Sequence, residues 1–409
     1  MPGGTTDAAP MKDNKDMVGT LGISRSRDGS GTSWNPDDSP VYALMTNLGG
    51  FRLMLHENVF VGYDWFSGAR GDARFMSTNW VMAKASHDLG PGEIGARAML
   101  SAEPLTVGLQ GYPLIFQTGD TARGKTLHDH QHPHELFVEL AAMYTVPLSD
   151  DVGIELYVAP AGEPALGPTT VMHRLSSMPD PLIPIGHDWE DSTHISFGVI
   201  TAAVFSKTLK LDASWFNGRE GDENRYDLDL RVPDSVSVRL TWNPTSAWSA
   251  QASYGYLASP EAQEPNVSVN RLTASATYDA ANVVGANVAT TFIAGTNIEN
   301  TGQVTPAFAL ENAWDIDGHN QLFGRLEYVL KSGGQLALPS SHGSEELFST
   351  GLADIGYVYS FGPYFGLQPG VGARGSIGIA DPALAGVYGT HFPLGAVLFV
   401  QLRPGAMSP

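Results

Sequence analysis

Apolar and polar residues alternate along most of the chain after residue 50. In the segment 51–66 the odd positions are apolar from Phe51 to Trp65, and only Glu57 interrupts that face. The even positions are largely polar. Because successive side chains of a β-strand point to opposite faces, a period of two predicts a strand with one apolar and one polar side.

The same alternation recurs often enough to build a large barrel, and Tyr and Trp stand repeatedly near the ends of the apolar faces, as in an interfacial aromatic girdle. The expected strands lie near 51–66, 73–88, 93–102, 136–148, 152–159, 194–205, 208–216, 234–242, 247–257, 269–278, 283–293, 306–314, 320–330, 347–360, 364–376 and 391–403.

The links between these segments are alternately short and long. Every second link has only a few residues, whereas 103–135 and 160–193 are the longest. Short periplasmic turns and long extracellular loops are typical of outer-membrane barrels. We therefore predict an all-β fold, a closed antiparallel transmembrane β-barrel of about 16 strands, with a range of roughly 14 to 18. A soluble all-β protein is the alternative.

The chain divides into three parts on this interpretation. Residues 1–50 are rich in Gly, Ser, Thr, Asp and Pro without a sustained period, and are expected to be a flexible leader or an inward-folded plug. The barrel spans 51–403 and a C-terminal tail spans 404–409. The start at Met1 lacks the basic and apolar regions of a secretory signal, which we interpret as a processed N-terminus.

Composition narrows the class further. Charged residues make up 16% of the chain, below the roughly 25% of soluble domains. Since 18 consecutive apolar residues occur nowhere, hydropathy excludes a transmembrane helix. The net charge of -20 disfavours nucleic acid as a partner, and the absence of cysteine excludes disulfides and thiolate metal sites.

Charged residues fall on the inward face of the expected strands. They could line a diffusion path whose excess acid favours cations. Alternatively, they could pair across strands and only compensate one another's charge inside the barrel. The inward charges are Arg52, Asp64, Arg97, Glu139, Glu155, Asp212, Arg239, Arg271, Glu311, Arg325, Glu327, Asp354 and Arg403.

Histidine is concentrated between residues 128 and 194. If the segment 127–137 is extended, its four histidines project from one side, so that two imidazoles could converge on one ion. Zinc or copper suits nitrogen and carboxylate ligands. Histidines that only hydrogen-bond within folded loops are the alternative. The candidate ligands are His128, His130, His132, His134, His173, His187, Asp191 and His194.

Signals of catalysis are weak. Ser192 lies near Asp191 and His194 in the sequence, but such adjacent residues rarely form the geometry of a nucleophile, a base and an orienting acid. No glycine-rich phosphate-binding loop occurs. We do not expect an enzyme.

Several motifs resemble an uncharacterised family of bacterial envelope proteins from about residue 40 to the C-terminus. They are the runs Gln131-His132-Pro133-His134-Glu135-Leu136-Phe137, Gly162-Glu163-Pro164-Ala165-Leu166-Gly167-Pro168, Met172-His173-Arg174 and Asp191-Ser192-Thr193-His194-Ile195. More generally the chain resembles porins, although it ends on 404–409 rather than on a terminal aromatic residue. The resemblance implies a location in the envelope.

These observations lead to a functional hypothesis with two branches. The first is a porin-like outer-membrane channel whose long loops carry a histidine-rich patch for zinc or copper. The second is a non-conducting barrel that anchors a partner in the envelope. Membrane lipid and lipopolysaccharide are the expected surroundings, and a homo-oligomer or an envelope protein is the expected protein partner.

Overall fold

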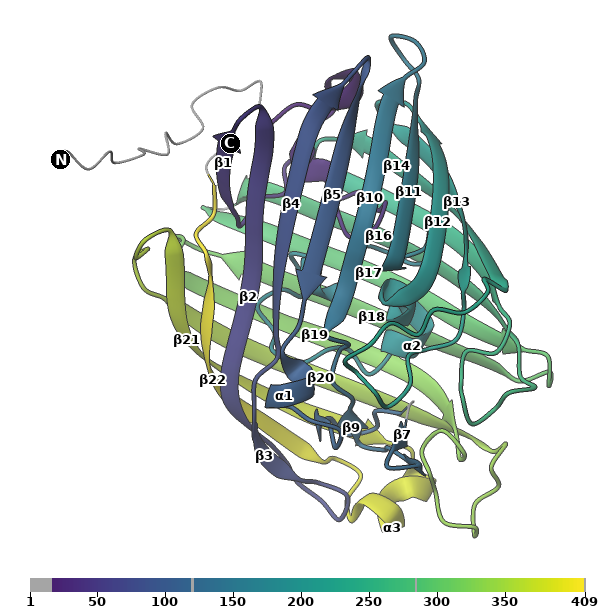
Figure 1. Ribbon diagram of the computed structural model, residues 1–409. Coiled ribbons are helices and arrows are strands. Elements are labelled where there is room, and N and C mark those ends of the chain that lie inside the picture. Colours follow the sequence, from purple (N-terminus) through teal and green to yellow (C-terminus); the bar gives the residue numbers. More distant parts are fainter. Residues whose placement is uncertain (1–16, 119–120, 284, 408–409) are drawn as a thin grey trace, which may run out of the picture.

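Sixteen long antiparallel strands close into one barrel, which confirms the predicted fold (Figure 1). A computed structural model describes residues 17–118, 121–283 and 285–407. Each strand pairs with the next, and β22 pairs with β2 to complete the ring. The barrel strands are β2 (Phe51–Phe66), β4 (Asn79–Leu89), β5 (Gly92–Leu100), β10 (Phe137–Pro147), β11 (Gly153–Gly162), β12 (Ser196–Phe205), β13 (Leu209–Asn217), β14 (Ser235–Thr245), β15 (Trp248–Leu257), β16 (Val269–Val283), β17 (Ala286–Glu299), β18 (Val304–Asp315), β19 (Asn320–Ser332), β20 (Leu347–Ser360), β21 (Leu367–Ala380) and β22 (Leu394–Pro404).

The other elements are short and belong to the loops and to the N-terminal segment. The strands are β1 (Leu44–Leu48), β3 (Ala73–Met76), β6 (Tyr112–Pro113), β7 (Thr121–Ala122), β8 (Lys125–Thr126) and β9 (His130–Gln131). The helical turns are α1 (Glu103–Thr106), α2 (His187–Glu190), α3 (Ala385–Tyr388), η1 (Thr20–Gly22), η2 (Arg25–Arg27), η3 (Val171–His173), η4 (Ser192–His194) and η5 (Pro382–Leu384). In the described part of the chain, no helix has the length and apolar character needed to span a membrane.

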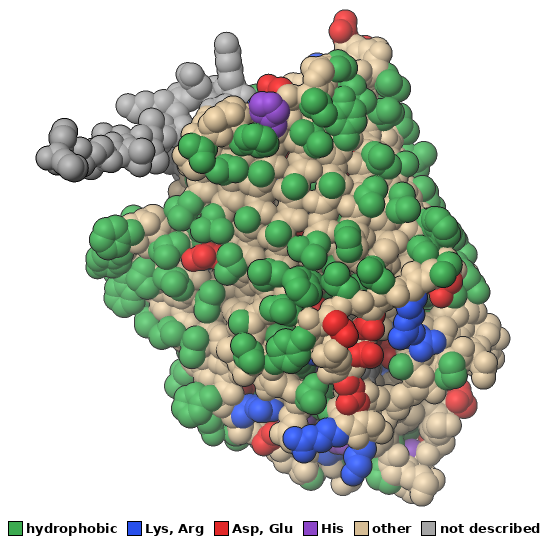
Figure 2. Space-filling view, viewed as in Figure 1, with side chains coloured by type: hydrophobic (Ala, Val, Ile, Leu, Met, Phe, Trp, Pro, Cys, Tyr) green, Lys and Arg blue, Asp and Glu red, His purple; other side chains and the backbone are tan. Residues whose placement is uncertain are grey.

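The alternation seen in the sequence separates an apolar exterior from a polar interior. On β2, Val61 and Trp65 are 49% and 41% exposed, whereas Asn58 and Asp64 are buried. Figure 2 shows apolar side chains spread over the outer face of the strands, with most charged side chains gathered toward the long-loop rim. Such an apolar outer face suits a lipid bilayer.

The barrel closes at a seam where its first strand, β2, pairs with its last strand, β22. β22 pairs with the second half of β2, from Val59 to Phe66, and β1 pairs with its first residues. β1 and β2 form a hairpin through Gly49 and Gly50, whose φ values of 59° and 85° favour glycine. Residues 44–48 are therefore a strand rather than part of an irregular leader, which corrects the sequence interpretation.

Two predicted strand boundaries also need correction. The single strand expected over 73–88 is broken at Ser77 and Thr78, because β3 and β4 pair with different parts of β2. The turn expected at 279–282 is instead largely strand, and β16 and β17 meet beside Gly285, which has a φ of 84°. The turn lies at Gly285 because glycine adopts a positive φ at little cost, although the alternation of apolar and polar residues is lost earlier.

The N-terminal segment 17–43 lies inside the barrel near the short turns (Figure 1). Thr32 donates a hydrogen bond to the buried carboxylate of Asp212 on β13, and Ser39 donates one to Asp279 on β16. Arg27 pairs with Asp37 and also donates to the carbonyl oxygen of Lys207. Residues 1–16 of the expected leader and residues 408–409 of the expected tail lie outside the described residues.

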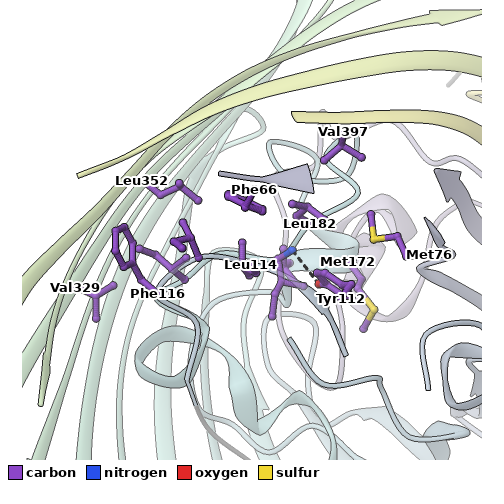
Figure 3. Packing of buried hydrophobic residues seen from close by; sticks show 14 of the residues in the cluster. Phe66, Met76, Tyr112, Leu114, Phe116, Met172, Leu182, Val329, Leu352 and Val397 are labelled. Carbon is purple, nitrogen blue, oxygen red and sulfur yellow. Dashed lines mark hydrogen bonds between the residues drawn. The ribbon is translucent and has the colours of Figure 1, made fainter. Parts of the chain in front are cut away.

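Two long loops fill the other half of the lumen. Tyr112, Leu114 and Phe116 from the loop 101–136 pack against Met172 and Leu182 from the loop 163–195 (Figure 3). The labelled wall residues of this cluster come from β2, β3, β19, β20 and β22, and they are Phe66, Met76, Val329, Leu352 and Val397. The interior thus contains an apolar core as well as charged groups.

Candidate functional site

The loop 163–195 is almost entirely buried and is held to the wall by Arg174. This guanidinium donates two hydrogen bonds to Glu311 on β18, at 2.7 and 2.8 Å, and one to Asp191 at 2.7 Å. On β17, Gly295 leaves room for the carbonyl oxygen of Trp189, which would lie only 2.3 Å from a Cβ atom there. The loop is therefore fastened at both its middle and its end.

The predicted inward charges lie largely in paired arrangements. Arg239 pairs with Asp212 at 2.8 Å, Arg97 with Glu139 at 2.9 Å, and Arg325 with Asp180 and Glu311 at longer range. Ten of the thirteen are buried, namely Asp64, Arg97, Glu139, Asp212, Arg239, Arg271, Glu311, Arg325, Glu327 and Arg403. Arg52 and Glu155 are partly exposed. Asp354, the remaining inward charge, accepts from Arg374. Their part in a solute path stays a prediction.

An acid-rich cavity of about 120 Å³ opens among the long loops. Asp188, Glu261, Glu264 and Glu299 line it, and Arg271 is the one basic residue in the lining. Burial, together with the charges of Asp188 and Glu264, raises the pKa of Glu261 to about 7. The carboxylates of this outer cavity are thus short of compensating positive charge.

A larger cavity of about 450 Å³ lies near the short turns, between the N-terminal segment and β16 to β19. Its lining again contains four carboxylates and one basic side chain. The basic residue is Arg403, and the acidic residues are Asp37, Asp38, Asp279 and Asp315.

We call the acid-rich cavity and the larger cavity the outer and the inner vestibule. Two smaller cavities lie between them. One, of about 40 Å³, is lined by Glu103, His134 and Met178 among others. The next, of about 90 Å³, shares Met178 with it and contains His56 and His173. That second cavity shares Leu175 and Met178 with the large vestibule. These three cavities therefore form a series with shared lining residues, and the acid-rich outer cavity shares no lining residue with them.

A histidine cluster separates the acidic outer cavity from this series. The ring centroids of His134 and His194 are 5.3 Å apart, and those of His187 and His194 are 5.0 Å apart. The Nδ1 atom of His187 contacts Asp191 at 2.6 Å, and the Nδ1 atom of His134 contacts Glu103 at 2.9 Å. His194 directs Nδ1 to the Asp191 carbonyl oxygen at 2.9 Å, and its Nε2 is buried without a hydrogen-bond partner.

The protonation of these histidines differs with their neighbours. Burial and the charges of His187 and His134 lower the pKa of His194, so this ring is neutral at pH 7. Burial also lowers the pKa of His132 to about 4, assisted by the charges of His134 and His187. Burial opposes protonation of His134, but the carboxylate of Glu103 outweighs it and raises the pKa of His134. Neutral imidazole is the form that binds metal ions.

The other predicted ligands lie apart from this cluster. Asp129 has a φ of 55°, which breaks the extended course expected for 127–137. His128 accordingly contacts Asp129, and His130 contacts Asp72, on another side of the loop. His173 lies beside His56 on β2. Asp191 is already engaged by Arg174 and His187, so it positions the loop and a histidine.

One acidic group also has the geometry of a cation site. Asp222, Asp227 and Asp229 each offer an oxygen, and these atoms lie within 4.8 Å of one another. Within the described ranges, this is the only set of three or more His, Asp or Glu side chains that meets this distance. The histidine cluster would therefore need side-chain movements to enclose an ion with three of its rings.

Sequence reasoning missed Glu103 and His56. His56 occupies an inward position of the first predicted strand, so its parity was a usable signal. Glu103 precedes Pro104 just after a strand and gives no periodic signal. Its contact with His134 depends on the path of the loop 101–136 inside the barrel.

Comparisons with solved structures find porins with the same fold. An anion-selective porin from Comamonas acidovorans has a TM-score of 0.53 at 11% identity, over 86% of this chain and 99% of that chain. OmpF of Salmonella typhi, in complex with daunomycin, has a TM-score of 0.53 at 10% identity, over 88% and 100%. OprB of Pseudomonas putida has a TM-score of 0.51 at 10% identity, over 87% and 94%.

Sequence comparisons add no family. No family model matches the chain, and no curated protein matches it. The predicted membership of an uncharacterised envelope family is therefore not confirmed. At these identities the structural likeness establishes the fold of outer-membrane porins, and the expected absence of catalysis stays a prediction.

Proposed function

We propose that this protein is an outer-membrane barrel that admits small cations through the narrow series of cavities in its lumen. The observation that carries the proposal is the excess of acid at both ends, where four carboxylates face one arginine in each vestibule. Carboxylates around a water-filled constriction attract cations and repel anions. The porin fold and the apolar outer face support the location in the outer membrane.

The filled lumen sets the expected scale of the flux. The loops 101–136 and 163–195 pack into an apolar core, and the cavities between the two vestibules are only about 40 and 90 Å³. A large hydrated solute would have to displace side chains to pass. We therefore propose a low-conductance path for ions and exclude bulk diffusion of large nutrients.

Planar-bilayer recordings test the cation preference. In a KCl gradient, the reversal potential should show selectivity for K⁺ over Cl⁻, and the double variant Glu261→Gln and Glu264→Gln should reduce that selectivity. Because the pKa of Glu261 is raised to about 7, its negative charge is lost as the pH falls from 8 to 6. Selectivity should fall over the same interval in the original protein and much less in the variant.

The control changes the same number of carboxylates outside the cavities. Asp150 and Asp151 are exposed at the tip of a short turn, so replacing both with Asn should leave the reversal potential nearly unchanged. Equal selectivity in all three proteins, or a preference for Cl⁻, would contradict the proposed role of the outer cavity.

The histidine cluster supports a finer proposal, that the path binds zinc or copper. Two imidazoles on one tetrahedral zinc ion, with Zn–N near 2.0–2.1 Å, place their ring centroids about 5 Å apart. The His134–His194 and His187–His194 spacings agree with that value. His187 and His194 also direct Nδ1 to an oxygen acceptor, the usual outer-shell arrangement of a metal-ligating histidine, and Nδ1 of His134 lies 2.9 Å from Glu103.

Replacing both His132 and His134 with Ala should remove most of the zinc or copper that the purified protein binds, while the barrel still folds. Metal content per chain by mass spectrometry, after dialysis against a stated free zinc concentration, is the measurement. Replacing His128 and His130 is the matched control, since these rings lie on another side of the same loop. Unchanged zinc content in the His132 and His134 variant would rule out this site.

A non-conducting barrel is the second candidate, and the apolar packing of the two loops favours it. Folded protein that gives no current in the bilayer would establish this alternative over the channel. Lipopolysaccharide, an envelope protein or a second copy of the chain would then be the partners to seek. The protein is proposed to act without catalysis in either case.

A further inference from the structure

His56 lines a cavity and has a buried ring nitrogen that lacks a hydrogen-bond partner. The side chain lies on the inner face of β2, and its Nε2 has no hydrogen-bond partner. The residue is only 8% exposed. Leaving a buried imidazole nitrogen unsatisfied costs free energy, so an orphaned atom of this kind indicates a missing ligand.

A second imidazole faces His56 from the loop that fills the lumen. The rings of His56 and His173 are 5.4 Å apart between centroids, and each lies against Trp80, at 4.6 and 4.8 Å. The spacing suits two nitrogens bound to a common ion, by the same geometry used for the histidine cluster.

Thioethers complete the surroundings of this pair. Met82 on β4 is the register partner of His56 on β2, and cross-strand partners have Cβ atoms about 4.5–5.5 Å apart. Met82 is 5% exposed, so it also points inward. Met54 and Met178 line the same cavity, which has a volume of about 90 Å³.

We propose that this cavity binds a monovalent soft metal ion, Cu(I), through His56, His173 and Met82. Thioether and imidazole ligands together select Cu(I), whereas carboxylate and carbonyl ligands suit hard divalent ions. None of these ligands is a carboxylate or a thiolate that would supply negative charge, so a single positive charge is easier to bury here than a double one.

Charges around the cavity agree with a neutral ligand set. Arg25, Arg52 and Lys84 line the cavity, but each is paired with a carboxylate outside the ligand set. Asp28 is the one carboxylate in the lining, and it forms an ion pair with Lys84. No carboxylate therefore competes with the imidazole and thioether ligands among the residues described at this cavity.

The site lies on the series of cavities in the proposed function, but its existence does not depend on conduction. It is also distinct from the cluster of His134, His187 and His194, which has no thioether in its ring contacts. A metal ion could bind here in a barrel that carries no current. The two proposals can thus fail independently.

Titration of the folded protein with Cu(I), held by a chromophoric competitor under anaerobic conditions, tests the site. We expect a Cu(I) site whose X-ray absorption spectrum contains both nitrogen and sulfur ligands. The variant His56→Ala should bind at this site at least tenfold more weakly. The variant Met82→Leu, which keeps the side-chain volume, should lose sulfur scattering from the spectrum.

Matched variants separate this site from other effects. Met143→Leu removes a methionine that lines a different cavity, and the His132 and His134 double variant removes the other metal cluster; both should keep the nitrogen and sulfur site. Heat-modifiable migration on a gel reports that each variant has folded. Absence of Cu(I) binding in the original protein, a spectrum without sulfur, or unchanged binding and spectrum in both His56→Ala and Met82→Leu would overturn the proposal.

Discussion

Replacing Arg174 with alanine should release the loop 163–195 from the barrel wall and raise the single-channel conductance severalfold. The guanidinium is 1% exposed and joins Glu311 on the wall to Asp191 in the loop. Without it, Asp191 keeps its contact with His187, and Glu311 keeps Arg325 at 3.4 Å. Removing one partner of a buried ion pair typically costs about 3–5 kcal/mol.

Two measurements follow the released loop. Conductance reports whether the path has widened, and chymotrypsin cleavage near Trp189, which is fully buried in the original protein, reports exposure of the loop. Arg231→Ala removes an exposed arginine from a different long loop and should change neither quantity. If Arg174→Ala keeps the original conductance and protease resistance, apolar packing alone holds the loop.

Replacing Leu240 with arginine should destabilise the barrel by about 2–4 kcal/mol, if this residue lies near the middle of the membrane. Leu240 is in the central part of β14 and is 50% exposed on the outer face. A guanidinium there would meet hydrocarbon instead of water. The free energy of unfolding in lipid vesicles, from guanidinium titrations followed by tryptophan fluorescence, is the measurement.

The matched control places the same charge on the long-loop side. Leu230 is 58% exposed in the loop 218–234, so Leu230→Arg should change stability by no more than about 0.5 kcal/mol. Equal effects of the two substitutions would mean that the outer face of β14 is not in contact with lipid.

The strands were predictable because each carries its own signal. A residue such as Val61 alternates with inward neighbours, and this period of two depends on nothing outside β2. The hairpin of β1 was missed because 44–48 lacks a sustained alternation, although Gly49-Gly50 is a recognisable turn signal. Local patterns therefore predicted the barrel but left β1, which pairs with the start of β2, unassigned.

The candidate sites were less predictable, because their contacts join residues that are distant in the sequence. His134 meets Glu103 and His194 only because two long loops fold into the same lumen. Clustering of histidines in the sequence did indicate the right region. It did not distinguish His134 from His130, because their contacts with Glu103 and with Asp72 depend on the path of the loop inside the barrel.

The seam between β2 and β22 also imposes an order on assembly. It joins Val59 to Leu402, and such long sequence separation makes closure a slow, late step in folding. The segment 17–43 and the loop 163–195 already lie within the ring that this step completes. Residues enclosed in this way have to take their places as the wall closes, so the filling of the lumen and the closing of the barrel belong to one assembly process.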